Sequence, residues 1–94
     1  MAFGIYFDVQ GMDSDKFRVV HEKLAEAGQA EPAGRTFHAG FDAGGAIKVF
    51  DVWESMEQFQ AFGATLMPIL AELEIDAGEP VIGEIELRLE PSAA

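Results

Sequence analysis

The sequence predicts an α+β domain with the element order βαββαβ, and three observations support this. Apolar and polar residues alternate near both ends of the chain, a pattern typical of β-strands. Two inner segments instead repeat apolar residues every three or four positions, which indicates helices. A glycine-rich turn separates two further strand-like segments. Right-handed connections arrange these elements as a ferredoxin-like fold, a four-stranded antiparallel sheet with two helices on one face.

The first two elements lie in residues 2–27. The predicted strand, residues 2–10, alternates four apolar residues with polar or small ones: Phe3, Ile5, Phe7 and Val9. Residues 11–14 interrupt this alternation and offer side chains that can cap a helix. We expect the helix from Asp13 to Ala27, because apolar residues recur there at helical spacing until Gly28.

The middle of the chain predicts a hairpin followed by a second helix. Residues 35–42 and 47–53 form its strands, joined at residues 43–45, Ala-Gly-Gly. Ser55 and Gln58 match a capping box, in which each side chain bonds the other residue's backbone amide, so the second helix starts there. Because Pro68 lies opposite the apolar stripe, we expect a kink or a tightened turn on the solvent side. A last strand is predicted over residues 78–90.

The hairpin register decides which side chains face the helices. An even-numbered loop gives three opposed pairs on the helix side: His38 with Asp51, Thr36 with Trp53, and Gly40 with Val49. On the last strand we expect the alternating apolar positions to face the helices as well: Val81, Ile85, Leu87 and Leu89.

The other side of the hairpin carries four large apolar side chains that no helix covers: Phe37, Phe41, Phe50 and Val52. An uncovered apolar patch of this kind marks an interaction surface. A second copy of the same sheet is the simplest cover, since most soluble homo-oligomers are closed two-fold dimers. The sequence therefore predicts a homodimer.

Length and charge exclude several classes of protein. The 94 residues fit one domain, residues 1–94. Six Lys and Arg against 17 Asp and Glu give a net charge of −11, which disfavours binding to nucleic acid and to anionic membranes. No apolar run approaches the ~20 residues that span a bilayer. The chain has no cysteine, which fits a reducing compartment, and we expect a cytoplasmic protein.

The candidate catalytic residues are His38 and Asp51, on the helix side of the hairpin. A carboxylate can fix the tautomer of an imidazole and raise its basicity, as a general base requires. Equally, the two can be a partly buried polar pair whose side chains only hydrogen-bond each other and have no catalytic role. Candidate substrate-binding residues surround them: Thr36, Trp53, His21, Phe62 and Leu66.

Those surrounding residues also have structural interpretations. Trp53 forms an aromatic wall for a ligand or plugs one end of the sheet. His21 lies at the flank of an apolar stripe, either at the mouth of the expected pocket or as a boundary histidine without a role. Phe62 and Leu66 line an adaptable pocket or belong to the core. The histidines lack a metal-binding spacing, and nucleotide and serine-hydrolase motifs are missing from the sequence, so we expect no metal and no cofactor.

Two segments carry a family resemblance: residues 51–55, Asp-Val-Trp-Glu-Ser, followed by Glu57, Phe59 and Phe62, and residues 66–70, Leu-Met-Pro-Ile-Leu. With them the chain resembles the dimeric α/β-barrel superfamily over roughly residues 3–90. The resemblance is to a branch of small proteins related to antibiotic-biosynthesis monooxygenases and polyketide cyclases. It implies two ferredoxin-like units packed sheet to sheet, and no catalytic residue is transferred from it.

Two functional hypotheses follow. The first is a cofactor-independent monooxygenase or polyketide cyclase that acts on an aromatic or polyketide-like carbonyl compound, with His38 as the proton acceptor. The second is a non-catalytic homodimer that binds a small hydrophobic ligand or serves as an accessory subunit. Only the first needs a titratable group in the pocket, and the pair of His38 and Asp51 is the feature that separates them.

Overall fold

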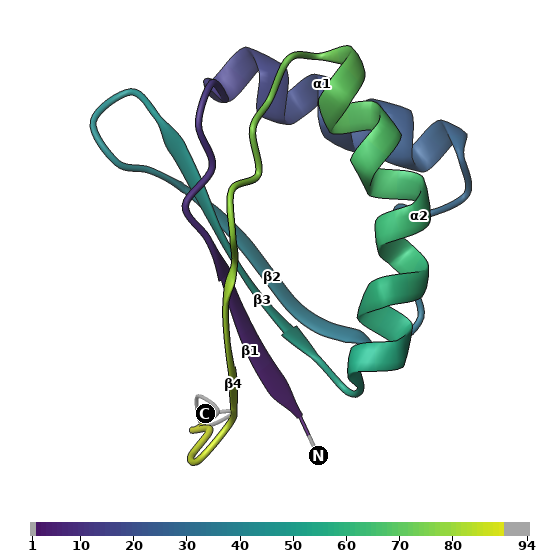
Figure 1. Cartoon of the computed structure of the whole chain (residues 1–94), viewed down its shortest axis with the longest axis vertical. Helices are drawn as coiled ribbons and strands as arrows, with labels where there is room; N and C mark the ends of the chain where they lie inside the picture. Colours follow the sequence, from purple (N-terminus) through teal and green to yellow (C-terminus); the bar gives the residue numbers. More distant parts are fainter. Residues whose placement is uncertain (1, 90–94) are drawn as a thin grey trace, which may run out of the picture.

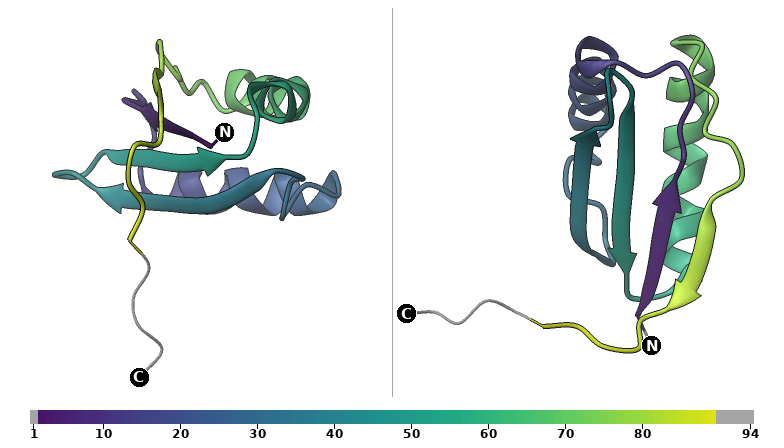
Figure 2. Two further views of the ribbon diagram at one scale, coloured as in Figure 1. Left: turned by 90° about the horizontal axis from the view of Figure 1, so that it is seen from below. Right: turned by 90° about the vertical axis from the view of Figure 1, so that its left-hand side faces the viewer.

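The computed structural model describes residues 2–89 and has the predicted element order. One antiparallel sheet, in the order β2-β3-β1-β4, contains β1 (Phe3–Phe7), β2 (Arg35–Asp42), β3 (Ile47–Trp53) and β4 (Val81–Glu84). Two helices, α1 (Ser14–Glu26) and α2 (Met56–Glu72), cover the same face of the sheet (Figures 1 and 2). The ferredoxin-like fold class is therefore confirmed. Neither helix is long and apolar enough to cross a membrane.

Both helices begin at the capping residues that the sequence indicates. The Asp13 carboxylate accepts the backbone N–H of Lys16 at 2.8 Å, and the Ser55 hydroxyl accepts that of Gln58 at 3.2 Å. Such caps satisfy a free amide at the helix start and stabilise by about 1 kcal/mol each. The Gln58 side chain does not return to the Ser55 backbone, as a capping box requires; it accepts a hydrogen bond from the Ser55 hydroxyl at 3.0 Å. Pro68 is exposed, and α2 continues past it.

The hydrophobic core lies between the sheet and the two helices. Its largest fully buried side chains come from β3, β1 and α1: Trp53, Ile5 and Leu24. The Trp53 ring packs against two rings of α2, with centroids 5.6 Å from Phe59 and 5.3 Å from Phe62. These contacts hold α2 over the end of β3, where the chain turns from the sheet into that helix.

The hairpin register is confirmed except at one end. His38 lies opposite Asp51, as predicted from the even-numbered loop. The predicted pairing of Thr36 with Trp53 is wrong, because Arg35 lies opposite Trp53 and a β-bulge separates Arg35 from the rest of β2. A bulge adds one residue to one strand and re-aims the side chains on either side of it. Thr36 is therefore exposed, and its hydroxyl lies 3.4 Å from the carbonyl oxygen of Val52.

The last strand is shorter than predicted and turned the other way. β4 covers only Val81–Glu84, and Ile82 pairs with the buried Ile5, so Ile82 is on the helix side. Val81 and Ile85 belong to the opposite side, where the Ile85 side chain lies over Gly4. The prediction failed because residues 81 and 82 are both apolar, so alternation alone does not identify the inner face. Leu87 and Leu89 are not covered by the helices and are 76% and 82% exposed, while residue 90 lies outside the described residues.

The first strand is also shorter than expected. β1 ends at Phe7, and Gln10 forms only an isolated bridge with Asp76. Val9 between them remains buried. The apolar side chains of this segment thus face the core as predicted, although the regular ladder stops before residue 10.

The side of the sheet that faces away from the helices is the outer face, and the predicted apolar side chains lie on it. Phe37 and Phe41 are 47% and 48% exposed, and the rings of Phe37 and Phe50 lie 6.2 Å apart. Val52 shares this face by register but is buried. Within the described residues, the outer face therefore keeps a partly uncovered aromatic surface.

Gly40 allows α1 to approach β2 closely, and this contact predicts the cost of enlarging it. A methyl group on Gly40 would overlap the ring of Phe17. We expect Gly40→Ala to lower the free energy of unfolding by about 1–3 kcal/mol, because overpacking forces neighbouring groups to move. The control is Gly63→Ala in α2, where nothing lies within 4 Å of the added methyl group and helix propensity favours alanine. Urea unfolding compares both variants with the wild type; equal stability of Gly40→Ala would contradict the contact.

Candidate functional site

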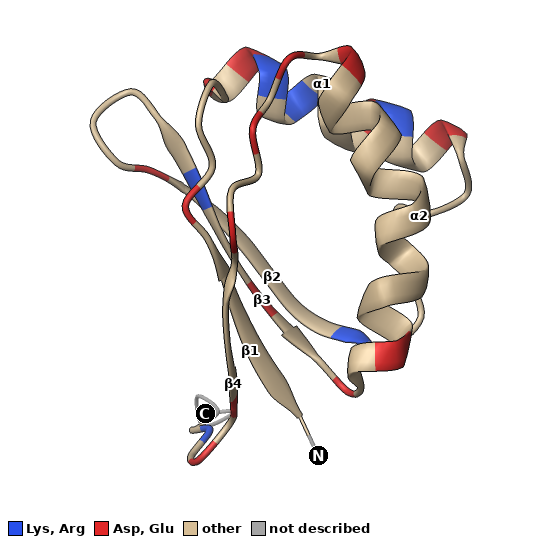
Figure 3. Cartoon of the chain, viewed as in Figure 1, with Lys and Arg blue, Asp and Glu red and all other residues tan. Residues whose placement is uncertain are grey.

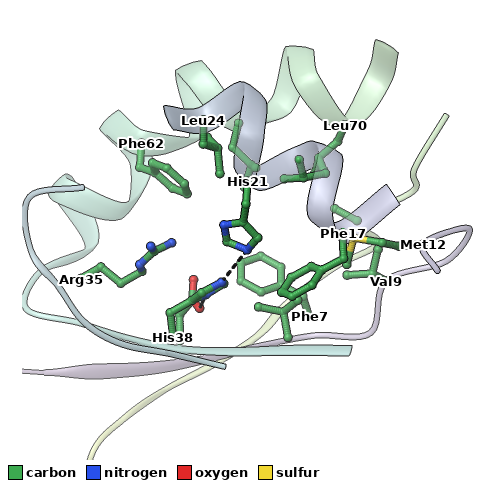
Figure 4. Close-up of a pocket in the computed structure, with 15 residues that line it drawn as sticks. Phe7, Val9, Met12, Phe17, His21, Leu24, Arg35, His38, Phe62 and Leu70 are labelled. Atoms are coloured by element: carbon green, nitrogen blue, oxygen red, sulfur yellow. Dashed lines mark hydrogen bonds and ion pairs between the residues drawn. The ribbon is translucent and has the colours of Figure 1, made fainter. Parts of the chain in front are cut away.

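A cavity of about 50 Å³ lies between the sheet and the helices (Figure 4). Its wall is mostly apolar and is built from both helices and from strands β1, β2 and β3. Four polar side chains also line it: His21, Arg35, His38 and Asp51. One water needs only ~10–15 Å³ of such space. The polar groups therefore face a volume that several atoms of a ligand can occupy.

Asp51 is the buried charged residue of the described chain, with only 3% of its surface exposed. A buried carboxylate without partners destabilises a protein by several kcal/mol. Both oxygens of Asp51 have partners: Oδ1 accepts from His38 Nδ1 at 2.5 Å, and Oδ2 accepts from Trp53 Nε1 at 3.3 Å. The pairing of His38 with Asp51 that the sequence predicted is confirmed.

His21 extends this pair into the cavity from the helix layer. Its Nε2 lies 3.1 Å from Nε2 of His38, and Figure 4 shows the two rings meeting between α1 and the sheet. The ring of Phe17, one turn earlier in α1, packs edge-on against His21 with centroids 4.6 Å apart. Because residues four apart share one helix face, Phe17 braces the imidazole that His21 presents to His38.

With an ionised Asp51 and neutral histidines, the donor and acceptor chemistry gives this chain of hydrogen bonds one direction. The indole of Trp53 only donates, and an ionised carboxylate only accepts, so His38 carries its proton on Nδ1. A neutral His38 then has a lone pair on Nε2, which accepts the Nε2 proton of a neutral His21. His21 Nδ1 remains as an acceptor without a hydrogen bond from residues 2–89, and it is not sealed from solvent. In this state the network therefore ends in the lone pair of His21 Nδ1.

Burial lowers the pKa of His21 below its usual value of about 6.5. The neighbouring His38 and the positive charge of Arg35 lower it further, while Asp51 acts in the opposite direction. His21 is therefore neutral at neutral pH. A neutral imidazole is the form that can accept a proton.

This shift predicts how stability depends on pH. Unfolded His21 takes up a proton as the pH falls below about 6.5, whereas folded His21 resists protonation until lower pH. Proton uptake by the unfolded state therefore reduces the free energy of unfolding as the pH falls. As the pH is lowered from about 7 to about 5, we expect the free energy of unfolding to fall more for the wild type than for His21→Gln, which lacks this imidazole. Urea unfolding of both proteins at the two pH values measures these free energies. The same difference between the two proteins at both pH values would contradict the lowered pKa.

Arg35 is a site residue that the sequence interpretation missed. The bulge after it turns its side chain into the cavity, where the guanidinium carbon lies 5.6 Å from the centre of the Phe62 ring. Its Nη2 donates to the carbonyl oxygen of Ala30 at 3.2 Å. Burial lowers the pKa of Arg35 while Asp51 and Glu31 raise it, and arginine keeps its charge at any ordinary pH. Strand alternation offered no signal for Arg35, because a bulge breaks the alternation.

The structure brings together most, though not all, of the predicted site residues. Five of them line the cavity: His21, His38, Asp51, Phe62 and Leu66. Trp53 is fully buried behind Asp51, which fits the plugging role better than an aromatic wall open to a ligand. Thr36 lies outside the cavity because of the bulge, and it accepts a hydrogen bond from Arg88 at 3.1 Å. Within residues 2–89, no group of three or more metal-ligating side chains is placed to hold a metal ion.

Several solved structures resemble this chain. A protein assigned as an antibiotic biosynthesis monooxygenase from Chloroflexus aurantiacus J-10-fl has a TM-score of 0.66 and 14% identity, over 96% of this chain and 98% of that one. SnoaB, a cofactor-independent oxygenase from Streptomyces nogalater, has a TM-score of 0.62 and 21% identity, over 96% of each chain. A protein from Caulobacter crescentus CB15, assigned like the first, has a TM-score of 0.57 and 21% identity, over 94% of this chain and 89% of that one.

The chain shares the fold of antibiotic-biosynthesis monooxygenase-like proteins. The sequence itself matches no family model and no curated protein. Identities of 14–21% establish a common fold and leave the chemistry to be argued from the residues of the site.

Proposed function

We propose that the chain is a small enzyme that removes a proton from an aromatic or polyketide-like carbonyl compound and completes an oxygenation or a cyclisation without a cofactor. The observation that carries the proposal is the chain of hydrogen bonds from Asp51 through His38 to His21 within an apolar cavity. The fold likeness to SnoaB, a cofactor-independent oxygenase, supports the same class of reaction.

The proton moves along the histidine pair. A substrate with an acidic C–H next to its carbonyl gives this proton to His21 Nδ1, while the Nε2 proton of His21 passes to Nε2 of His38. His38 becomes an imidazolium whose Nδ1–H bonds the Asp51 carboxylate, so the new positive charge meets a buried negative one. His38 is the final proton acceptor and His21 is the relay. Positioned bases of this kind accelerate proton transfer about 10²–10⁴-fold.

The substrate, now an enolate, completes the reaction in one of two ways. In an oxygenation its carbon adds to O₂, the oxidant, and the resulting peroxide takes the stored proton from His38 to become a hydroperoxide. Loss of water from this hydroperoxide leaves a new carbonyl group, so one oxygen atom of O₂ stays on the carbon and the other leaves as water. In a cyclisation the same carbon attacks a second carbonyl group of the molecule, and the stored proton returns to the alkoxide that forms. The apolar wall favours both, because a low dielectric strengthens the interactions between the enolate and the charged groups around it.

Cavity size limits the substrate. An apolar cavity that holds benzene measures ~150 Å³, and this one measures about 50 Å³. An aromatic ring therefore enters only if lining side chains move. Met12 has the flexible, unbranched side chain suited to such movement, and Leu66 is only partly buried.

The test follows proton abstraction directly. In D₂O, the wild type should exchange the α-protons of 2-indanone, a compact enolisable aromatic ketone, as measured by loss of the proton NMR signal. We expect His38→Ala to reduce the catalysed rate by about 100-fold or more, because the proton loses its final acceptor. Asp51→Asn should also be slow, since it no longer stabilises the imidazolium. The control is Arg18→Gln, at a surface ion pair with Glu22.

Two outcomes would contradict the proposal. Full exchange by folded His38→Ala would remove His38 as the acceptor. Saturable binding of 2-indanone without any exchange would instead support the second hypothesis, a ligand-binding or accessory protein. An oxygen electrode distinguishes the two enzyme reactions, since only oxygenation consumes O₂.

The outer face is proposed to pack against a second copy of the chain. Phe37 and Phe41 are about half exposed, and Val81 on the edge strand is 68% exposed. A two-fold axis places this apolar surface against an identical one, so each copy covers the other. The chain as a whole is strongly acidic, with a net charge of −11, and apolar burial must therefore exceed the electrostatic repulsion between two copies.

Charge placed on this surface should abolish the dimer. We expect sedimentation equilibrium to give twice the chain mass for the wild type and the single-chain mass for Phe37→Glu with Phe41→Glu. Burying two carboxylates from each copy in an apolar interface disfavours association strongly. The control is Met67→Glu, at an exposed apolar residue of α2 on the opposite layer. A monomeric wild type, or a dimeric double variant, would contradict the interface.

A further inference from the structure

Arg35 is the fixed positive charge on the cavity wall. The other polar residues there are two histidines and Asp51, and no lysine lines the cavity. Figure 4 shows the guanidinium extending from β2 toward the histidine pair, beneath Phe62. Figure 3 shows the other basic residues on α1, on β3 and near the end of the described chain, away from this position at the start of β2.

The carboxylates near Arg35 do not neutralise it by direct contact. Within residues 2–89, the ion pairs join other partners, and none includes Arg35. Asp51 acts on Arg35 electrostatically, but its two oxygens already bond His38 and Trp53. Glu31 also acts on Arg35, and it is exposed to solvent.

The guanidinium also keeps most of its hydrogen-bonding capacity. An arginine has five N–H donors in a planar fork. In the described part of the chain, one of them is used, by the carbonyl oxygen of Ala30. The ring of Phe62 holds the planar group from one side by a cation–π contact, which positions it without occupying the donors in its plane. A planar fork with free donors in an apolar cavity suits a carboxylate, which binds arginine in two parallel hydrogen bonds.

We propose that Arg35 forms an anion subsite of the cavity and that the ligand is a small enolisable carbonyl compound bearing a carboxylate. The carboxylate bonds the Arg35 guanidinium, and the apolar remainder of the ligand lies along Phe62 and the aliphatic wall. The α-carbon proton then faces the histidine pair. The substrate class rests on the proposed proton abstraction, whereas the anion subsite itself rests only on the geometry of Arg35.

A matched pair of ligands tests the subsite without any turnover. Benzoate and benzamide have nearly the same size and shape, and only benzoate carries a negative charge. Trp53 is the only tryptophan of the chain, and its indole N–H bonds Asp51 on the cavity wall, so its ¹H–¹⁵N signal is an assigned reporter. Titration of this signal gives the affinity for each compound.

We expect benzoate to bind at least about tenfold more tightly than benzamide, since a charge-assisted hydrogen bond contributes that much or more. Arg35→Gln should reduce benzoate affinity about tenfold or more and leave benzamide unchanged. Arg35→Lys keeps the positive charge but lacks the planar fork, so its benzoate affinity should lie between those of the wild type and Arg35→Gln. It also replaces Arg35→Gln in this test if that variant folds poorly. Arg18→Gln, at the surface, should bind like the wild type.

The subsite is overturned if benzoate and benzamide bind equally, if neither shifts the Trp53 signal, or if Arg35→Gln binds benzoate like the wild type. These results are independent of catalysis, because benzoate has no enolisable proton. Arginine-dependent benzoate binding without α-proton exchange in any ketone would keep the subsite and remove the enzyme. If α-proton exchange depends on the histidines but benzoate binding does not depend on Arg35, the proposed enzyme stands and the anion subsite is contradicted.

Discussion

The buried carboxylate of Asp51 is the constraint that organises the site. A charge at 3% exposure is stable only if its surroundings supply hydrogen bonds, and the indole of Trp53 and the imidazole of His38 supply them. Because an ionised carboxylate can only accept hydrogen bonds, the nitrogen of His38 that faces Asp51 must carry the proton. The contact with Asp51 therefore also sets the tautomer of His38. The same interaction that makes the buried charge tolerable thus prepares a basic nitrogen at the cavity.

The ferredoxin-like fold brings the components of this network together from distant parts of the sequence. Asp51 and His38 are neighbours across the β2–β3 hairpin, whereas His21 comes from α1 on the other layer. Gly40 has no side chain to separate Phe17 from the sheet, and Phe17 in turn braces His21. The position of the His21 imidazole therefore depends on helix–sheet packing as much as on the hydrogen bonds themselves.

How far the sequence predicts this protein differs from residue to residue. The N-cap residues of both helices, the hairpin and the pairing of His38 with Asp51 follow from local chemistry and loop parity, and they are confirmed, although Gln58 does not complete the capping box. Arg35, and not Thr36, lies opposite Trp53 because a β-bulge shifts this end of the strand by one residue. The alternation of apolar and polar residues gives no sign of this bulge. The last strand fails for a related reason, since successive apolar residues 81 and 82 fit either face. The contact between His21 and His38 joins two layers, and no pattern within one element predicts it.

The tautomeric state of the two histidines decides whether the hydrogen bonds run from Asp51 through His38 to His21. Long-range ¹H–¹⁵N NMR correlation of labelled imidazoles distinguishes protonated from unprotonated ring nitrogens. At slightly alkaline pH we expect His38 to carry its proton on Nδ1 with a bare Nε2, and His21 to carry its proton on Nε2 with a bare Nδ1. A His38 protonated on Nε2, or rings that average between both tautomers, would contradict the directed chain from Asp51 and with it the proposed path of the proton.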